Sequence, residues 1–184
     1  MVVFCEPKNV KLFFGFFYSS GQIYQTTRDL SIKEYGSLDF ESEAADFKFT
    51  DYYREEMGSN LKRRFISFKK LIHPQEIIEA KLFSAKIEKK FCLVNKRRIN
   101  IDPGYINDAK IVLSTTKDFS HRIYLGKKVF AEITLLYKNK GFRNLPWTYP
   151  DFRTKPYKDI FIKMRSLYKE QLKKNLPVKI PVIS

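Results

Sequence analysis

Hydrophobic residues alternate along the chain between strand-like runs and helix-like stripes. The run Val10 to Tyr18 (VKLFFGFFY) is apolar at nearly every position, which is typical of a central strand covered on both faces. Residues 22–35 carry apolar side chains at helical spacing and stop at Gly36, a common helix terminator. Two further strands are predicted around residues 38–49 and 61–68, joined by a polar connection.

The second half of the chain repeats this pattern. A helix is predicted from Pro74 to Phe91, because proline is tolerated in the first turn, and its two apolar stripes suggest that it is covered on two sides. Strands are predicted at residues 98–102 and 110–115, followed by a hairpin that turns at Gly126-Lys127. The last helix, residues 155–174, follows the i, i+3, i+4, i+7 rule of an amphipathic helix.

This order of elements predicts an α+β fold with a mainly antiparallel sheet. Strand, helix, strand, strand, helix and strand together suggest a ferredoxin-like βαββαβ core, to which a β-hairpin and a C-terminal amphipathic helix are added. The 184 residues fit a single domain, with flexible ends at residues 1–8 and 176–184.

The charge balance limits the classes of binding partner that the protein is expected to have. The chain has 35 Lys and Arg against 20 Asp and Glu, a formal net charge of +15, and phosphate groups are the commonest partners of such basic proteins. A solvated basic surface is the alternative. The two cysteines and the lack of an export signal favour a cytoplasmic protein with reduced thiols. No apolar run approaches the ~20 residues of a membrane span, so we expect no membrane partner. The oligomeric state is left open.

Several common kinds of functional site are excluded because the sequence lacks their motifs. None of the seven glycines stands in the G-x-x-x-x-G-K-S/T arrangement of a P-loop, although nucleotide binding by another route stays open. The two histidines and two cysteines lack the spacing of zinc ligands. His73 precedes the proline that starts a helix, which favours a structural role.

Charged and hydroxyl residues interrupt the predicted strands between residues 96 and 137, where an unpaired charge is costly to bury. Asp102 and Glu132 are the candidate catalytic residues, and the same two carboxylates are the candidate ligands of a divalent metal ion. The candidate phosphate contacts are Arg63, Arg98, Lys110, Lys117 and Arg122. Thr115, Thr116 and His121 complete the candidate site.

Two of these residues have alternative interpretations. Asp102 precedes Pro103 and Gly104, which predicts a rigid turn that either aims the carboxylate or is merely capped by it. Glu132 is either a site residue or the buried ion-pair partner of Arg98 or Arg122. If the first interpretation holds, we expect one cleft to contain Asp102, Lys110, Lys117, Arg122 and Glu132, with Arg63 or Arg98 reaching it from a neighbouring strand.

The segments FTDYYREEMG, LKRRFISFKKLI, NIDPGYINDAKIVLSTTKDFSHRIYL, FAEITLLY and LPWTYPDFRT resemble those of the domain of unknown function 4416 family, an uncharacterised bacterial family. The resemblance covers essentially the whole chain. It implies no established activity and no catalytic residues.

Three hypotheses of function follow. We favour a binder or enzyme acting on a phosphorylated small molecule or nucleotide, with a divalent metal as candidate cofactor, because interleaved acidic and basic residues suit a compact anion. The alternatives are an RNA-binding module, since ferredoxin-like sheets often bind RNA, and a non-catalytic interaction protein. Whether the chain is an enzyme is left open.

Overall fold

The computed structural model describes residues 4–47, 57, 60–94 and 96–174. In chain order the elements of the first half are β1 (Val10–Tyr18), α1 (Gly21–Tyr35), β2 (Leu38–Glu41), β3 (Ala45–Asp46), β4 (Lys62–Ile72), η1 (Pro74–Glu76) and α3 (Ile77–Lys90). The second half contains β5 (Ile99–Ile106), β6 (Lys110–Thr115), β7 (Ile123–Gly126), β8 (Val129–Lys138), β9 (Gly141–Asn144), η2 (Asp151–Arg153) and α4 (Lys155–Lys174).

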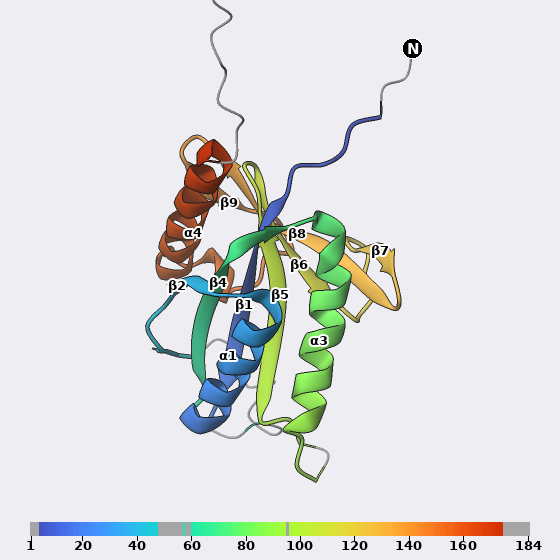
Figure 1. The fold of residues 1–184 in the computed structure, drawn as a ribbon, viewed down its shortest axis with the longest axis vertical. Coiled ribbons are helices and arrows are strands. Elements are labelled where there is room, and N and C mark those ends of the chain that lie inside the picture. The colour runs from blue at the N-terminus through green and yellow to red at the C-terminus, as the bar shows by residue number, and fades with distance from the viewer. Residues whose placement is uncertain (1–3, 48–56, 58–59, 95, 175–184) are drawn as a thin grey trace, which may run out of the picture.

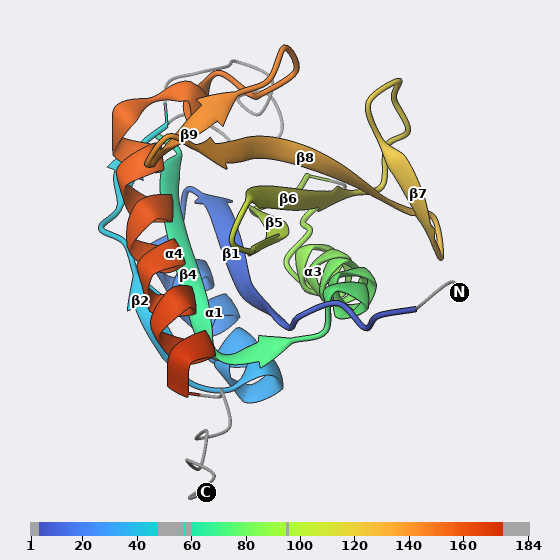
Figure 2. The same ribbon diagram turned by 90° about the horizontal axis from the view of Figure 1, so that it is seen from above.

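The nine described strands form one sheet in the order β2-β4-β1-β5-β6-β8-β7, with β3 added to β4 and β9 added to β8. Every strand pair is antiparallel. Figures 1 and 2 show the helices around this curved sheet. The predicted α+β class with a mainly antiparallel sheet is confirmed. The strand order β2-β4-β1-β5 and the crossover helices α1 and α3 agree with the expected core, but the ferredoxin-like label itself stays a prediction.

Strand β1 lies at the centre because its side chains are buried on both faces, as its sequence predicts. Phe14 and Phe16 belong to a core cluster that includes residues of α1 and α3. Phe13, which points to the other face, belongs to a second cluster with Phe161 and Met164 of α4. Two helices therefore cover one face of the sheet and α4 covers the other.

The helices begin and end close to where the sequence predicts. Ser20 caps α1 by accepting a hydrogen bond from the backbone N–H of Ile23, and Gly36 ends it with a φ of 89°. Helix α4 spans the predicted residues and buries one stripe. The expectation that α3 is covered on two sides is wrong: its buried residues form one stripe, and Leu82 on the outer side is 38% exposed, because α3 packs on the sheet along a single face.

The segment Asp102-Pro103-Gly104 is not a turn, and both turn interpretations of Asp102 are wrong. All three residues lie inside β5. Gly104 has no positive φ but is needed for close packing, since a Cβ there would lie 2.5 Å from Phe13 Cζ and 2.7 Å from the carbonyl oxygen of Val112. The local turn preference of Pro and Gly is overridden by the pairing of β5 with β1, and at Gly104 also by its pairing with β6.

The single domain and the flexible ends stay predictions, and residues 1–3 and 175–184 lie outside the described part of the chain. Within that part, each helix is too short or too polar to cross a lipid bilayer.

Candidate functional site

A cavity opens where the sheet separates between β5 and β6. The two strands pair only from Gly104 with Leu113 to Ile106 with Ile111, so the first half of β5 has β1 alone as its neighbour. Side chains replace the missing strand. The N–H of Ile101 donates to Glu88 Oε1 at 2.7 Å, and Lys81 Nζ donates to the Ile101 carbonyl at 3.4 Å.

A proline suits the edge of β5 that has no strand beside it, because a proline has no N–H to leave unpaired there. Residues 101 and 103 of a strand present their backbone groups to the same side, so an N–H at position 103 would face the opening. Pro103 has none, and its carbonyl accepts a hydrogen bond of 3.0 Å from Ser114 Oγ. The sequence that looks like a turn is therefore suited to an unpaired strand edge.

The cavity has a volume of about 800 Å³, within the usual range for small-molecule sites. It is lined by strand ends, by α3 and by the loop before α4. Five basic side chains (Arg63, Lys81, Arg97, Lys117 and Arg122) and four acidic ones (Glu88, Asp102, Glu132 and Asp151) contribute to its wall, together with hydroxyl groups and the rings of Phe17, Phe47, Tyr149 and Phe152.

Arg63 is the most deeply buried cation of the cavity, at 1% exposed. It leaves β4, crosses over Gly15 of β1, and donates from Nη1 to Asp102 Oδ2 of β5 at 2.9 Å. Gly15 makes this path available, because a Cβ there would lie 2.8 Å from Nη2. The guanidinium carbon lies 3.8 Å from the ring centroid of Phe17. Nε and Nη2 have no hydrogen-bond acceptor among the described residues.

Asp102 is held by a chain of hydrogen bonds along the cavity wall. Its second oxygen accepts from Asn100 Nδ2 at 2.8 Å, and the Asn100 oxygen accepts from Arg97 Nη1 at 2.8 Å. Arg97 also pairs with Glu88 at 3.9 Å. Burial raises the pKa of the Glu88 carboxyl, against the opposing effect of Lys81. Asp102 is thus fixed from both sides.

Glu132 of β8 anchors a second cluster and is 2% exposed. It accepts hydrogen bonds from Arg122 Nε at 2.8 Å and pairs with His121 Nε2 at 3.1 Å. Of the two ion-pair partners predicted for Glu132, the structure selects Arg122. Arg122 also donates to the Tyr149 hydroxyl at 2.8 Å, and burial raises the pKa of Tyr149 to about 12.

Asp151 lies beside these groups in the loop before α4 and is 5% exposed. Burial is the largest cause that raises the pKa of its carboxyl; Arg63 opposes the increase and Asp102 adds to it. The cavity therefore contains a carboxyl that holds its proton more tightly than a solvated aspartate does.

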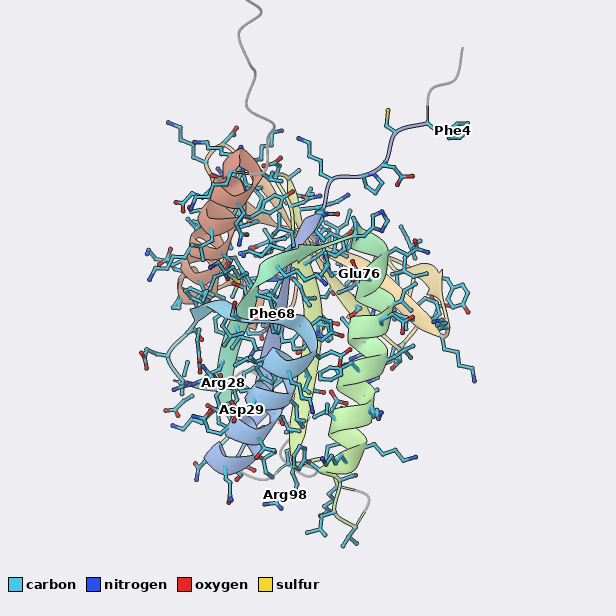
Figure 3. All side chains as sticks on the ribbon, viewed as in Figure 1. Phe4, Arg28, Asp29, Phe68, Glu76 and Arg98 are labelled. Carbon is cyan, nitrogen blue, oxygen red and sulfur yellow. The ribbon has the colours of Figure 1, made fainter. Side chains whose placement is uncertain are left out.

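The structure brings most of the predicted site residues together but not all. Arg63, Asp102, Thr115, Thr116, Lys117, Arg122 and Glu132 line the cavity, and His121 contacts it through Glu132. Lys110 lies at the other end of β6, against a separate hollow near Pro7 and Pro74. Arg98 is exposed and does not line the cavity; Figure 3 places it at the lower end of the molecule.

The predicted divalent metal stays a prediction. In the described residues no three His, Cys, Asp or Glu side chains are grouped closely enough to hold a metal ion. Asp102 and Glu132 each accept from an arginine, so a metal would have to displace those donors.

Sequence reasoning missed part of the cavity wall. Lys81 and Glu88 belong to α3, and only the separation of β5 from β6 brings them to the opening. Tyr149 and Asp151 had a detectable signal: they stand in LPWTYPDF, an aromatic, proline-punctuated loop, and loops carried by a rigid scaffold often hold site residues.

Fold and site together define an α+β protein with a cavity of small-molecule size, lined by charged and aromatic side chains, at an opening in its sheet. The chain belongs to the family described as Domain of unknown function (DUF4416), whose model matches residues 8–168. No curated protein and no solved structure matches the chain.

Proposed function

We propose that the cavity binds a small molecule that carries a phosphate group, with a nucleotide among the candidates. The observation that carries this proposal is Arg63: a buried guanidinium at the cavity wall whose Nε and Nη2 lack acceptors among the described residues. Unpaired buried donors are costly, and a ligand oxygen would satisfy them. The planar fork of arginine suits the oxygens of a phosphate group.

The surroundings of Arg63 fit the two parts of such a ligand. The rings of Phe17, Phe47 and Phe152 provide an apolar wall for an organic group. Thr115, Thr116 and Lys117, at the end of β6, add polar groups for the anion. We assign Asp102 and Glu132 a positioning role in place of acid–base catalysis. The carboxylate of Asp102 accepts a hydrogen bond from Arg63, and that of Glu132 accepts one from Arg122.

RNA binding is the second candidate. An RNA-binding sheet stacks bases on exposed aromatic side chains, whereas the aromatic residues of β1 are buried on both faces by the helices. The small-ligand proposal is therefore preferred.

Isothermal titration calorimetry at two salt concentrations tests this choice. The ligands are inorganic phosphate, ATP, GTP, glucose 6-phosphate and a short RNA. We expect one small phosphorylated ligand to bind with a shallow salt dependence. RNA binding would weaken steeply, with a log–log slope of about −0.7 for each phosphate contact. Measurable RNA affinity without affinity for any small ligand would reverse the proposal.

Variants then locate the site. Arg63→Met should weaken ligand binding by about 2–5 kcal/mol, the usual effect of removing one partner of a buried charged contact. Arg63→Met/Asp102→Asn, which leaves no carboxylate unpaired, keeps the test valid if the single variant is unstable. Arg64→Met is the matched control, because Arg64 lies next in the strand and pairs with Glu41 on the opposite face.

A second pair of variants tests the far wall of the cavity. Lys117→Gln should weaken ligand binding, while Lys110→Gln, outside the cavity, should not. Wild-type affinity in folded Arg63→Met would refute the proposal.

A further inference from the structure

The connection between α3 and β5 exposes aliphatic side chains at its tip. Leu93 and Lys96 form an isolated antiparallel bridge, with two backbone hydrogen bonds of 2.9 Å. Leu93 is 61% exposed and Val94 is 86% exposed. In Figure 1 this connection extends past the lower end of α3. We call residues 89–94, Lys96 and Arg98 the α3–β5 tip.

Val94 is in an unfavourable backbone conformation. Its φ is 49°, in the left-handed region that β-branched residues rarely adopt and that Gly or Asn tolerates well. The position is thus unfavourable twice over, because the aliphatic side chain is also left in water. Neither cost is explained by packing in the core, and strained residues of this kind are often found at functional surfaces.

The charge around these aliphatic side chains is of one sign. Residues 89–98 contain five basic residues and no acidic one. Arg97 turns inward to Glu88. Lys89, Lys90, Lys96 and Arg98 are exposed, and none of these four forms an ion pair with another residue in the described part of the chain.

We propose that the α3–β5 tip docks the protein on the surface of an anionic lipid bilayer. Aliphatic side chains at a projecting point enter the interface between headgroups and acyl chains, and the surrounding cations bind the anionic headgroups. Single-stranded nucleic acid is held instead by stacking on aromatic rings, and the one aromatic ring of this tip, Phe91, packs against the core.

This contact is peripheral, and it departs from our expectation of no membrane partner, because that expectation considered only membrane-spanning segments. The membrane contact does not depend on the proposed ligand, but it would affect where the cavity lies relative to the bilayer. Arg97 belongs to the same connection and lines the cavity wall, so a docked tip holds that side of the cavity close to the bilayer.

Flotation of the full chain with vesicles tests the proposal. The bound fraction should be low with phosphatidylcholine alone and high when about 30% phosphatidylserine is added, because each basic side chain contributes roughly a fivefold factor near an anionic surface. Lys89→Gln/Lys90→Gln should therefore weaken binding about 25-fold. Lys163→Gln/Lys173→Gln, which removes the same charge from exposed positions of α4, is the matched control and should have little effect.

Leu93→Ser/Val94→Asn tests the apolar contribution and should weaken vesicle binding at least about tenfold. Asn suits the left-handed position, so the melting temperature of this variant should equal or exceed that of the wild type. Equal binding to both kinds of vesicle overturns the proposal. So does vesicle binding that the Leu93→Ser/Val94→Asn variant retains and a short RNA abolishes, since that result assigns the tip to nucleic acid.

Discussion

Two buried cations lie on the same face of the sheet and differ in how completely they are satisfied. Lys11 of β1 is fully buried, and its ammonium group donates to Asp39, to the carbonyl of Phe68 at 3.1 Å and to Gln171 at 2.9 Å. Arg63 of β4 is equally buried, but only Nη1 has an acceptor in the described residues.

The difference separates a structural charge from a site. The three donors of Lys11 match three acceptors, and Gln171 belongs to α4, so this cluster fixes the helix to the sheet. Arg63 lines a cavity and keeps two nitrogen atoms unsatisfied. Burial of a charge is therefore a poor marker of function by itself; an unsatisfied donor beside an open volume is a better one.

The largest effect is expected at Lys11. Lys11→Met should lower the free energy of unfolding by about 3–5 kcal/mol, because it leaves Asp39 without its cation in a nearly buried position. Ligand affinity measured on the remaining folded protein should not change. Urea denaturation gives the first quantity and calorimetric titration the second. A loss of affinity in the folded variant would make the two cations equivalent and remove the distinction.

Gly15→Ala should give an intermediate effect, and on both quantities. The added Cβ would lie 2.8 Å from Arg63 Nη2 and 2.9 Å from Phe65 Cε1, so we expect a loss of about 1–3 kcal/mol in stability together with weaker ligand binding, as the guanidinium moves. Gly21→Ala is the control, since no atom lies within 4 Å of a Cβ at that position. Unchanged affinity in Gly15→Ala would show that the position of Arg63 does not matter for the ligand.

The smallest change in stability is expected for Asp151→Asn, and here the sign of the change is informative. Its pKa is raised in the folded state, so its favourable contribution to stability is present below the unfolded pKa, near 3.8, and is lost as the pH rises through the folded pKa. Asp151→Asn, which resembles the protonated form, should remove this pH dependence and be at least as stable as the wild type at pH 7.

Urea denaturation across the acidic range measures this difference. Asp102→Asn provides the contrast, because it leaves Arg63 without its ion pair and should lower stability at pH 7. A loss of stability at pH 7 in Asp151→Asn would show that the charged form of Asp151 is the one that the fold uses.

The sequence predicts those parts of the fold that depend on local pattern. The burial of Val10–Tyr18 and the amphipathic stripe of Lys155–Lys174 follow from spacing alone, and both agree with the structure. Alternation in β4 also indicates that Arg63 and Arg64 face opposite ways, and only Arg63 reaches the cavity.

The parts that failed depend on distance or on tertiary pairing. The sequence analysis expects Lys110 and Lys117 in one cleft, but β6 is long enough, at ~3.3 Å per residue, to keep Lys110 at its first residue away from Lys117, which follows its last. The local sequence predicts a turn at Asp102 because Pro and Gly follow it, but the pairing of β5 with β1 overrides that preference. Lys81 and Glu88 required knowledge that two strands separate, which no local pattern contains.

The way in which the two halves of the sheet are joined also has a mechanical consequence. Three residue pairs, from Gly104 with Leu113 to Ile106 with Ile111, join the β1 half of the sheet to the β8 half. The two halves are joined again outside the sheet, because Phe161 of α4 packs in one core cluster with Phe13 of β1 and Leu135 of β8. We therefore expect this packed core, and not the short ladder, to set the separation between Asp102 on one half and Lys117 on the other. A ligand would then enter a preformed volume and would spend little of its binding free energy on moving the two halves.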